Sequence, residues 1–314
     1  MSRAGTTRKL ILALIAASPL LAQAWLLPKG EGAVALTYQN NYLPDHVFSK
    51  GERHDVGPIH LQGMLTDVDY SLSDKLALRI GLPYFAGKYE GPVPHQLPID
   101  DGTYHGTLQD FHIDARYNIR RRPVVLTPFV RGVIPSHAYE HYAHSTIGRR
   151  LPELHVGVNV GRRLDFISSN AFLQARYAYV LGKRTEGIVP RRSDIEFQMG
   201  YFLTPRWSVM ALGSWTHPHN GIDYILGLFP DNLTPGQLLN HDRIARLSSV
   251  DLGGGVSFAA SKSMDLFASA VTSVRSRNGH ALASAVTVGV SWHFRTAWAG
   301  IPETPSPALP GSGR

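Results

Sequence analysis

Ionisable side chains occupy every second position in several stretches of this 314-residue chain. In DFHIDARYNI, residues 110–119, these positions hold Asp110, His112, Asp114 and Arg116, and apolar or aromatic residues stand between them. A period of two is that of a β-strand whose two faces differ. Carboxylates and guanidinium groups on one face can bind a polar solute, or they can pair with opposite charges on a neighbouring strand.

The same ionisable face recurs along the chain, and its charges alternate in sign from one expected strand to the next. Two interpretations follow. The face lines a translocation path with a selective charge distribution, or its salt bridges brace the wall of a narrow barrel. The residues expected on a lumenal path are Asp110, Asp114, Arg116, Arg131, Arg176, Asp194 and Glu196, with Asp67, Asp69 and Arg79 on the same face.

Histidine is the other chemically active residue that the chain uses often, with 15 in total. His137, His141 and His144 share one expected loop, and THPHNG (216–221) opens another. Imidazoles at such spacing can bind zinc or copper. The chain has no Cys, however, and Glu140 is the one carboxylate close to these histidines. We therefore expect solvated loop histidines, and neither a metal nor another cofactor.

Motifs of common enzymes are absent from the sequence. The chain has no G-x-S-x-G, no phosphate-binding P-loop and no H-E-x-x-H. THPHNG holds two histidines but no Ser that could form the nucleophile–base pair of an outer-membrane lipase. The sequence therefore favours a protein that is not an enzyme, and an outer-membrane hydrolase is the third interpretation after the two given below.

The first 24 residues have the pattern of a secretory signal peptide. Arg3, Arg8 and Lys9 precede an apolar stretch, 10–21, which an Ala-Gln-Ala cleavage site follows. Loss of 1–24 removes three positive charges and no negative ones, so the formal net charge of +7 becomes +4. This modest charge on an exported chain does not indicate a nucleic-acid partner. Without Cys, the exported protein must be stable without disulfides.

Twelve strands are expected in the rest of the chain, separated by short turns that alternate with longer loops. This order is typical of an antiparallel up-and-down meander. The strands are mostly about 10–15 residues long, which exceeds the usual length of about 5–6 and suits a tilted membrane-spanning strand of about 9–11 residues. They are placed at 32–43, 58–72, 75–86, 107–119, 124–135, 151–161, 170–181, 192–204, 206–216, 246–259, 263–275 and 282–294.

The two faces of these strands distinguish a membrane barrel from a soluble β-sandwich. The apolar faces carry aromatic residues at both ends, as two girdles at the two membrane interfaces. In 282–294 the polar face consists of small residues, which fit a crowded interior better than a solvated surface. The expected girdles are Tyr70, Tyr117, Tyr201, Trp207, Phe258, Trp292 and Phe294 near the short turns, and Tyr42, Tyr84, Phe111, Tyr177, Tyr179 and Trp215 near the long loops.

We therefore predict a single all-β domain, a 12-stranded antiparallel up-and-down transmembrane β-barrel of residues 25–294, in the outer membrane of a Gram-negative bacterium. The last residues, 295–314, contain four prolines and are expected to form a disordered periplasmic tail. Expected partners are outer-membrane lipid and lipopolysaccharide, the outer-membrane assembly machinery and a small-molecule solute.

The longest loop, 217–245, is unusually apolar for a water-exposed connection. Its stretch GIDYILGLFP, 221–230, is followed by a segment, 234–244, that is expected to form a short helix with Thr234 as N-cap. The apolar stretch is a plug packed in the lumen, a hydrophobic gate, or a contact surface for lipopolysaccharide or a partner. The expected gate residues are Tyr224, Ile225, Leu226, Leu228 and Phe229.

Two stretches, 73–85 and 106–119, resemble the outer-membrane transporters of the phenol meta-degradation pathway. Where that family has a G-x-G-D segment, this chain has Gly-Thr-Leu-Gln-Asp. The resemblance implies a barrel that passes small hydrophobic or aromatic compounds. The alternative is a structural or surface-interaction barrel that transports nothing, closed by lumenal salt bridges and loop 217–245. The matching positions are Pro83-Tyr84, Gly106, Asp110 and Arg116-Tyr117.

Overall fold

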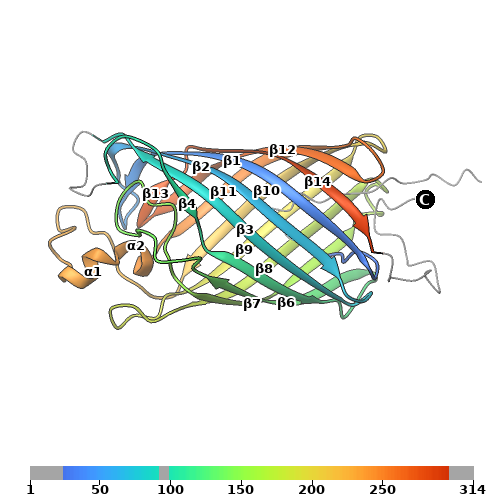
Figure 1. Ribbon diagram of the computed structural model, residues 1–314, viewed down its shortest axis with the longest axis horizontal. Helices are drawn as coiled ribbons and strands as arrows, with labels where there is room; N and C mark the ends of the chain where they lie inside the picture. Colours follow the sequence, from blue (N-terminus) through green and yellow to red (C-terminus); the bar gives the residue numbers. More distant parts are fainter. Residues whose placement is uncertain (1–23, 92–98, 297–314) are drawn as a thin grey trace, which may run out of the picture.

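A computed structural model describes residues 24–91 and 99–296 of the chain. These residues form one closed β-barrel, with long loops at one end and short turns at the other (Figure 1). Two short helices, α1 (Pro235–Leu239) and α2 (His241–Ile244), lie at the long-loop end. Within the described residues, no helix has the length and apolar character needed to span a membrane.

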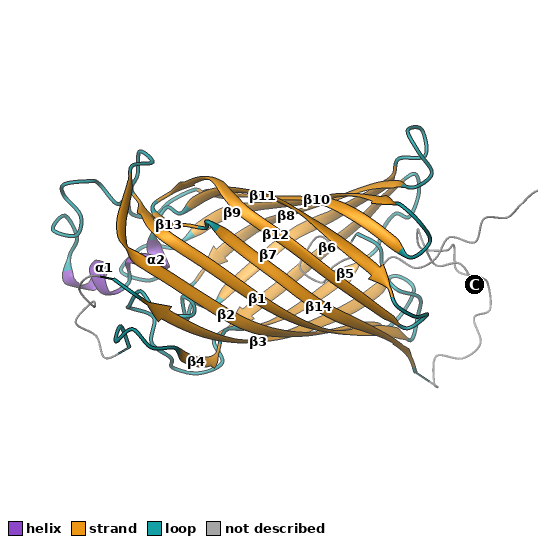
Figure 2. Ribbon diagram, turned by 90° about the horizontal axis from the view of Figure 1, so that it is seen from above, coloured by secondary structure: helices purple, strands orange, loops and turns teal. Residues whose placement is uncertain are grey.

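The strands run antiparallel to their neighbours around the barrel, and β1 closes it by pairing with both β2 and β14. Because β4 continues into β5 and β13 into β14, the 14 strand segments make twelve positions in the wall (Figure 2). The strands are β1 (Glu31–Val47), β2 (Arg53–Ser71), β3 (Leu76–Tyr89), β4 (His105–Leu108), β5 (Phe111–Tyr117), β6 (Val124–Ile134), β7 (Glu153–Arg163), β8 (Ala171–Gly182), β9 (Arg191–Phe202), β10 (Trp207–Pro218), β11 (Ser248–Ala259), β12 (Met264–Arg277), β13 (Gly279–Ala281) and β14 (Ser284–Arg295).

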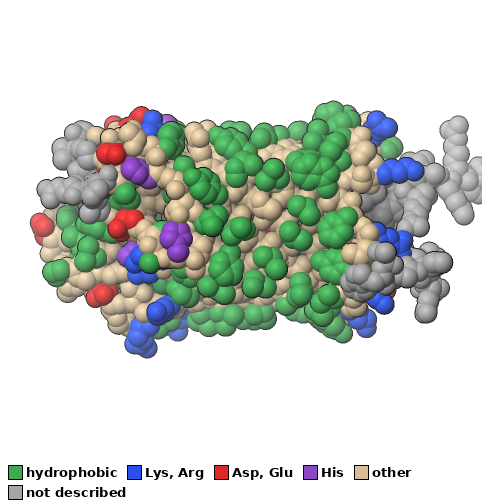
Figure 3. All heavy atoms as spheres, in the orientation of Figure 1, with side chains coloured by type: hydrophobic (Ala, Val, Ile, Leu, Met, Phe, Trp, Pro, Cys, Tyr) green, Lys and Arg blue, Asp and Glu red, His purple; other side chains and the backbone are tan. Residues whose placement is uncertain are grey.

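Alternation along each strand separates an inner face from an outer one, as predicted. In β3, Arg79 is 6% exposed, whereas its neighbours Leu78 and Ile80 are 37% and 52% exposed. Figure 3 shows outer apolar side chains spread over the barrel wall between the two rims, with the charged side chains at the rims. An exposed apolar surface of this extent on a closed antiparallel barrel requires lipid around it, so the fold belongs in the outer membrane.

The strands differ from the expected ones at the long-loop end. The segment 107–119 is broken at Gln109 and Asp110, because both side chains bond to a loop inside the barrel mouth. The loop expected at 44–57 shortens to 48–52, because β1 and β2 pair as far as Val47 and Arg53. The barrel therefore extends beyond the membrane at this end.

Candidate functional site

The lumen has a charged wall and a wall of small residues. Cross-strand register places the charged side chains on the inner faces of β2 to β9. On the opposite side, β10 to β14 and β1 present residues such as Ser208, Gly255, Ser269, Thr287 and Ala35. Larger side chains, such as Met210 and Phe267, are buried among these small ones, and the ion pair of Asp265 with His293 lies on the same side. The sequence pattern alone predicted the small inner face only for the last strand.

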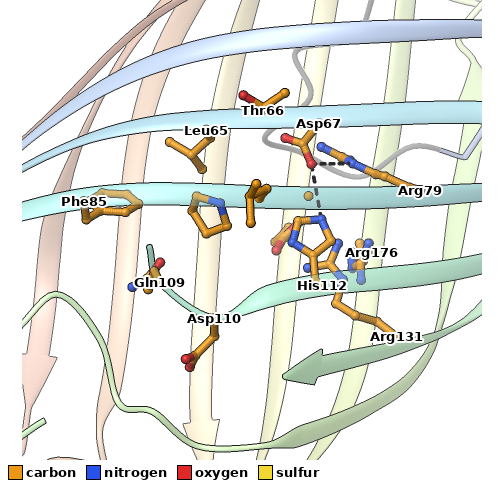
Figure 4. A pocket seen from close by; sticks show the side chains of 14 residues that line it. Leu65, Thr66, Asp67, Arg79, Phe85, Gln109, Asp110, His112, Arg131 and Arg176 are labelled. Carbon is orange, nitrogen blue, oxygen red and sulfur yellow. Dashed lines mark hydrogen bonds and ion pairs between the residues drawn. The ribbon is translucent and has the colours of Figure 1, made fainter. Parts of the chain in front are cut away.

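Asp114 is the centre of the charged wall and is completely buried. Its two carboxylate oxygens accept hydrogen bonds from Nε and Nη2 of Arg131, at 2.6 and 2.9 Å. Arg176 approaches the same carboxylate at 3.7 Å. On the next strands, Arg79 donates to Asp67 at 3.0 Å, and the two residues are drawn in Figure 4. The pairs of Arg131 with Asp114 and of Arg79 with Asp67 join neighbouring strands, as the alternating signs predicted, whereas Arg176 reaches Asp114 across two strands.

All seven residues expected on the lumenal path face the interior. Asp114, Arg131 and Arg176 share one network, and Glu196 is the register partner of Arg176. The other three lie apart from that network. Arg116 pairs with Asp69 on the side of the short turns, Asp194 pairs with Arg192, and Asp110 accepts a hydrogen bond from Tyr139 at the mouth.

A second ion-pair group lies nearer the mouth, and the sequence analysis did not find it. Glu153 accepts two hydrogen bonds of 2.8 Å from Arg192, and it also pairs with Arg149 and, at 3.1 Å, with His155. Glu153 is the first residue of β7, and the alternation in the expected strand 151–161 puts it on the same face as His155. The sequence analysis did not use this signal.

A cavity of about 270 Å³ opens along the charged wall (Figure 4). Leu65, Pro83 and Phe85 form its apolar side, while Arg131 and Arg176 line its charged side. Nη2 of Arg176 is buried, forms no hydrogen bond within the described residues and lies 3.7 Å from the Asp114 carboxylate. The cavity can therefore hold a small solute with one apolar part and one acceptor group.

Loop 135–152 fills the mouth of the barrel. Tyr139 and Ile147 are buried against Phe85, with Leu61 and Leu65 beside them. The loop backbone lies so close to β3 that a Cβ atom on Gly87 would lie 2.1 Å from the carbonyl oxygen of a loop residue. The sequence analysis named loop 217–245, as a plug, a gate or a contact surface, and gave loop 135–152 no such role. The shorter loop enters because its Tyr139 hydroxyl bonds to Asp110 within the wall.

Loop 219–247 covers that plug from outside. Among the expected gate residues, Tyr224 is fully buried and packs against Phe229, whose tilted ring has its centroid 4.8 Å away. Ile225, Leu226 and Leu228 are 39–54% exposed, so these three side chains are not packed within the loop, and their role in a gate stays a prediction. The expected helix forms with Thr234 as N-cap in a capping box, but it is interrupted at Asn240 between α1 and α2.

Histidines join the outer cover to the wall, so not all of them are solvated as expected. His46 lies 5.0 Å from His280 and 5.1 Å from Tyr224 between ring centroids, and His144 lies 5.5 Å from His280. His46 and His280 are in the parts of β1 and β13 that extend beyond the membrane. No group of metal-binding side chains that could hold an ion occurs within 24–91 and 99–296.

Acid is expected to loosen this cover. Burial lowers the pKa of His46 from 6.5 to about 4 and that of His280 to about 3, although Asp242 acts in the opposite direction. Between pH 6.5 and 4 the folded state therefore binds fewer protons than the unfolded state. The free energy of unfolding decreases as the pH falls through this range, because protonation favours the unfolded state. We expect the conductance of the protein in a planar bilayer to rise over this range.

The His46→Phe, His280→Phe double variant is the control for this acid response. It lacks both buried imidazoles, while His54, His144, His241 and Asp242 remain around the site. Its conductance should stay constant across the same pH range. An equal rise in this variant would contradict the role of the two histidines.

The N-terminal segment narrows the other end of the lumen. The hydroxyl group of Thr127 donates to the carbonyl oxygen of Ala24 at 2.6 Å, and the Trp25 ring packs edge-on against Phe172 at 6.2 Å. Leu26 is also buried. Cleavage after Ala24 remains a prediction, and it would leave Trp25 and Leu26 in this position. The sequence gave no signal for the insertion, because these residues precede the first strand.

Comparison with known proteins supports the fold. A crystal structure of an outer-membrane channel from Pseudomonas putida is similar with a TM-score of 0.66 and 11% identity, over 90% of this chain and all of that one. The protein is an outer-membrane β-barrel. The NanC porin (TM-score 0.49, 8% identity, 82% of this chain and 98% of that one) and the NalP translocator domain of Neisseria meningitidis (0.49, 10%, 85% and 90%) are more distant. No protein-family model and no curated protein matches the sequence.

Proposed function

We propose that this barrel passes small solutes across the outer membrane, and that its preferred solutes are aromatic or otherwise apolar compounds with one acceptor group. The cavity beside the Asp114 network carries this proposal, because apolar side chains and two arginines, Arg131 and Arg176, line the same space. The likeness of 73–85 and 106–119 to transporters of the phenol meta-degradation pathway and the channel fold from Pseudomonas putida agree with it.

The proposed path runs along the charged wall, through the cavity that opens beside it. In this path Arg131 and Arg176 bind the acceptor group, and Asp114 holds Arg131 in place. Asp110, Arg116, Asp194 and Glu196 set the potential along the lumen. Tyr224 and Phe229 belong to the outer cover, which must move with loop 135–152 for a solute to enter.

Substitution of Arg176 tests the proposed path. Benzoate should block the current through the refolded protein in a planar bilayer, and Arg176→Gln should weaken this block about tenfold, because a hydrogen bond to a charged group contributes about 1.5–3 kcal/mol. Arg206→Gln, in an exposed turn between β9 and β10, is the matched control and should leave the block unchanged. Equal block in both variants would contradict the assigned site.

A barrel that transports nothing is the second candidate. The closure of the lumen by loop 135–152 and by the N-terminal segment favours it, as do the braced charges on the wall. Current and solute flux distinguish the two candidates. A protein without transport shows no current and no solute flux in either the intact form or the forms with a shortened loop.

A further inference from the structure

A basic hollow of about 600 Å³ lies on the outside of the barrel at the long-loop end. It is formed where β8 ends and β9 begins, by Leu181, Arg184, Ile188, Arg191 and Asn220 among others. Leu181 and Arg191 are register partners on the outer face. The hollow is therefore separate from the lumen and continuous with the wall that faces lipid.

The outer face changes character in steps towards this hollow. The register of β8, β9 and β10 gives three levels on the outer face. Apolar and aromatic residues lie farthest from the long-loop rim, mixed aromatic and polar residues come next, and the level at the rim contains basic residues. The same order occurs in a lipid, from acyl chains through the ester or sugar region to the phosphate. The three levels are Tyr177, Ile195 and Trp215; then Tyr179, Ser193 and His217; then Leu181, Arg191 and His219.

The positive charge at the rim is not neutralised by the protein. In the described part of the chain, neither Arg184 nor Arg191 forms an ion pair; Nη1 of Arg184 donates to a backbone carbonyl at 3.3 Å. Glu186, in the same loop, instead contacts Asn240 beside α1, at 3.5 Å. Arg192, the next residue along β9, points inward and pairs with two carboxylates. The two outward guanidinium groups thus remain available.

We propose that this hollow binds a phosphate group of lipid A, the membrane anchor of lipopolysaccharide, at the extracellular rim of the barrel. Arginine binds phosphate through paired hydrogen bonds, and basic pockets beside membrane-spanning segments bind anionic headgroups. The acyl chains lie against Tyr177 and Trp215, which a free phosphate ion would not contact.

Native mass spectrometry of the mature protein in detergent, titrated with purified lipid A, tests the site. Wild type should retain one lipid A molecule. The double variant with Arg184→Gln and Arg191→Gln should bind lipid A at least about tenfold more weakly, because two charge-assisted contacts are lost. The matched control, Arg206→Gln, Lys262→Gln, removes the same charge from the exposed turns at the opposite rim and should bind as wild type does. Equal loss in both double variants would overturn the site.

Three further arms identify the ligand. Dephosphorylated lipid A should bind wild type as weakly as phosphorylated lipid A binds the Arg184, Arg191 variant. Inorganic phosphate should not displace the lipid, and displacement would overturn the proposal in favour of a free-ion site.

The third arm tests for hydrolysis, because the hydroxyl group of Ser193 and Nε2 of His219 share a hydrogen bond of 2.9 Å. Deacylated lipid formed by wild type but not by Ser193→Ala would also overturn the proposal, because the face would then be a hydrolytic centre.

Discussion

Replacement of residues 137–148 by a short Gly-Ser linker is expected to raise the conductance of the barrel severalfold. This segment carries Tyr139 and Ile147, which fill the mouth beside Phe85. The adjoining strands end at Ile134 and begin again at Glu153, so the linker leaves their pairing intact. Single-channel recording in a planar bilayer measures the change, and circular dichroism checks that the β-structure is kept.

The matched control shortens the outer cover by removing 225–228. These residues include Ile225, Leu226 and Leu228, which are exposed and pack against no plug. Their loss should change the conductance little. If this control opened the channel and removal of 137–148 did not, the gate would lie in loop 217–245, as the sequence analysis expected.

The N-terminal segment should limit the current that remains after the loop is shortened. Trp25 and Leu26 lie at the opposite end of the lumen, against Phe172 and its neighbours. Adding Trp25→Ala and Leu26→Ala to the shortened-loop protein should therefore raise the conductance further. No further rise would show that the plug in the mouth is the single barrier.

Asp114→Ala is expected to lower the free energy of unfolding by about 3–5 kcal/mol, which is the usual cost of removing one partner from a buried ion pair. The substitution leaves Arg131 and Arg176 close together inside the wall, without their shared carboxylate. Urea titration of the protein in lipid vesicles, followed by tryptophan fluorescence, measures the loss.

Asp165→Ala provides the comparison. Asp165 pairs with Arg163 at 3.1 Å in an exposed turn, and such surface pairs contribute little. This variant should unfold close to wild type. If Asp114→Ala lowered the free energy of unfolding as little as Asp165→Ala does, water would have to solvate the two arginines. The charged wall would then border an open aqueous lumen.

The sequence determined the elements that repeat with a period of two. In 110–119 the alternation alone separates the lumenal Asp114 and Arg116 from the lipid-facing Ile113 and Tyr117, and the structure has the same two faces. Most strand positions followed from the same signal, apart from the strand ends at the long loops. Successive residues of a membrane strand face lipid and the lumen in turn. The polarity of each residue therefore indicates which face of the barrel wall it occupies.

Only the tertiary structure decided which segments close the barrel. Nothing in the spacing of Tyr139, Trp25 or Glu153 shows that the first two enter the lumen or that the third meets Arg192 from two strands away. Apolar content pointed to 221–230, but a loop is placed by the wall residues that it can bond, and Asp110 bonds Tyr139. Loops and chain ends lack a repeating environment, so their positions depend on contacts between residues far apart in the sequence.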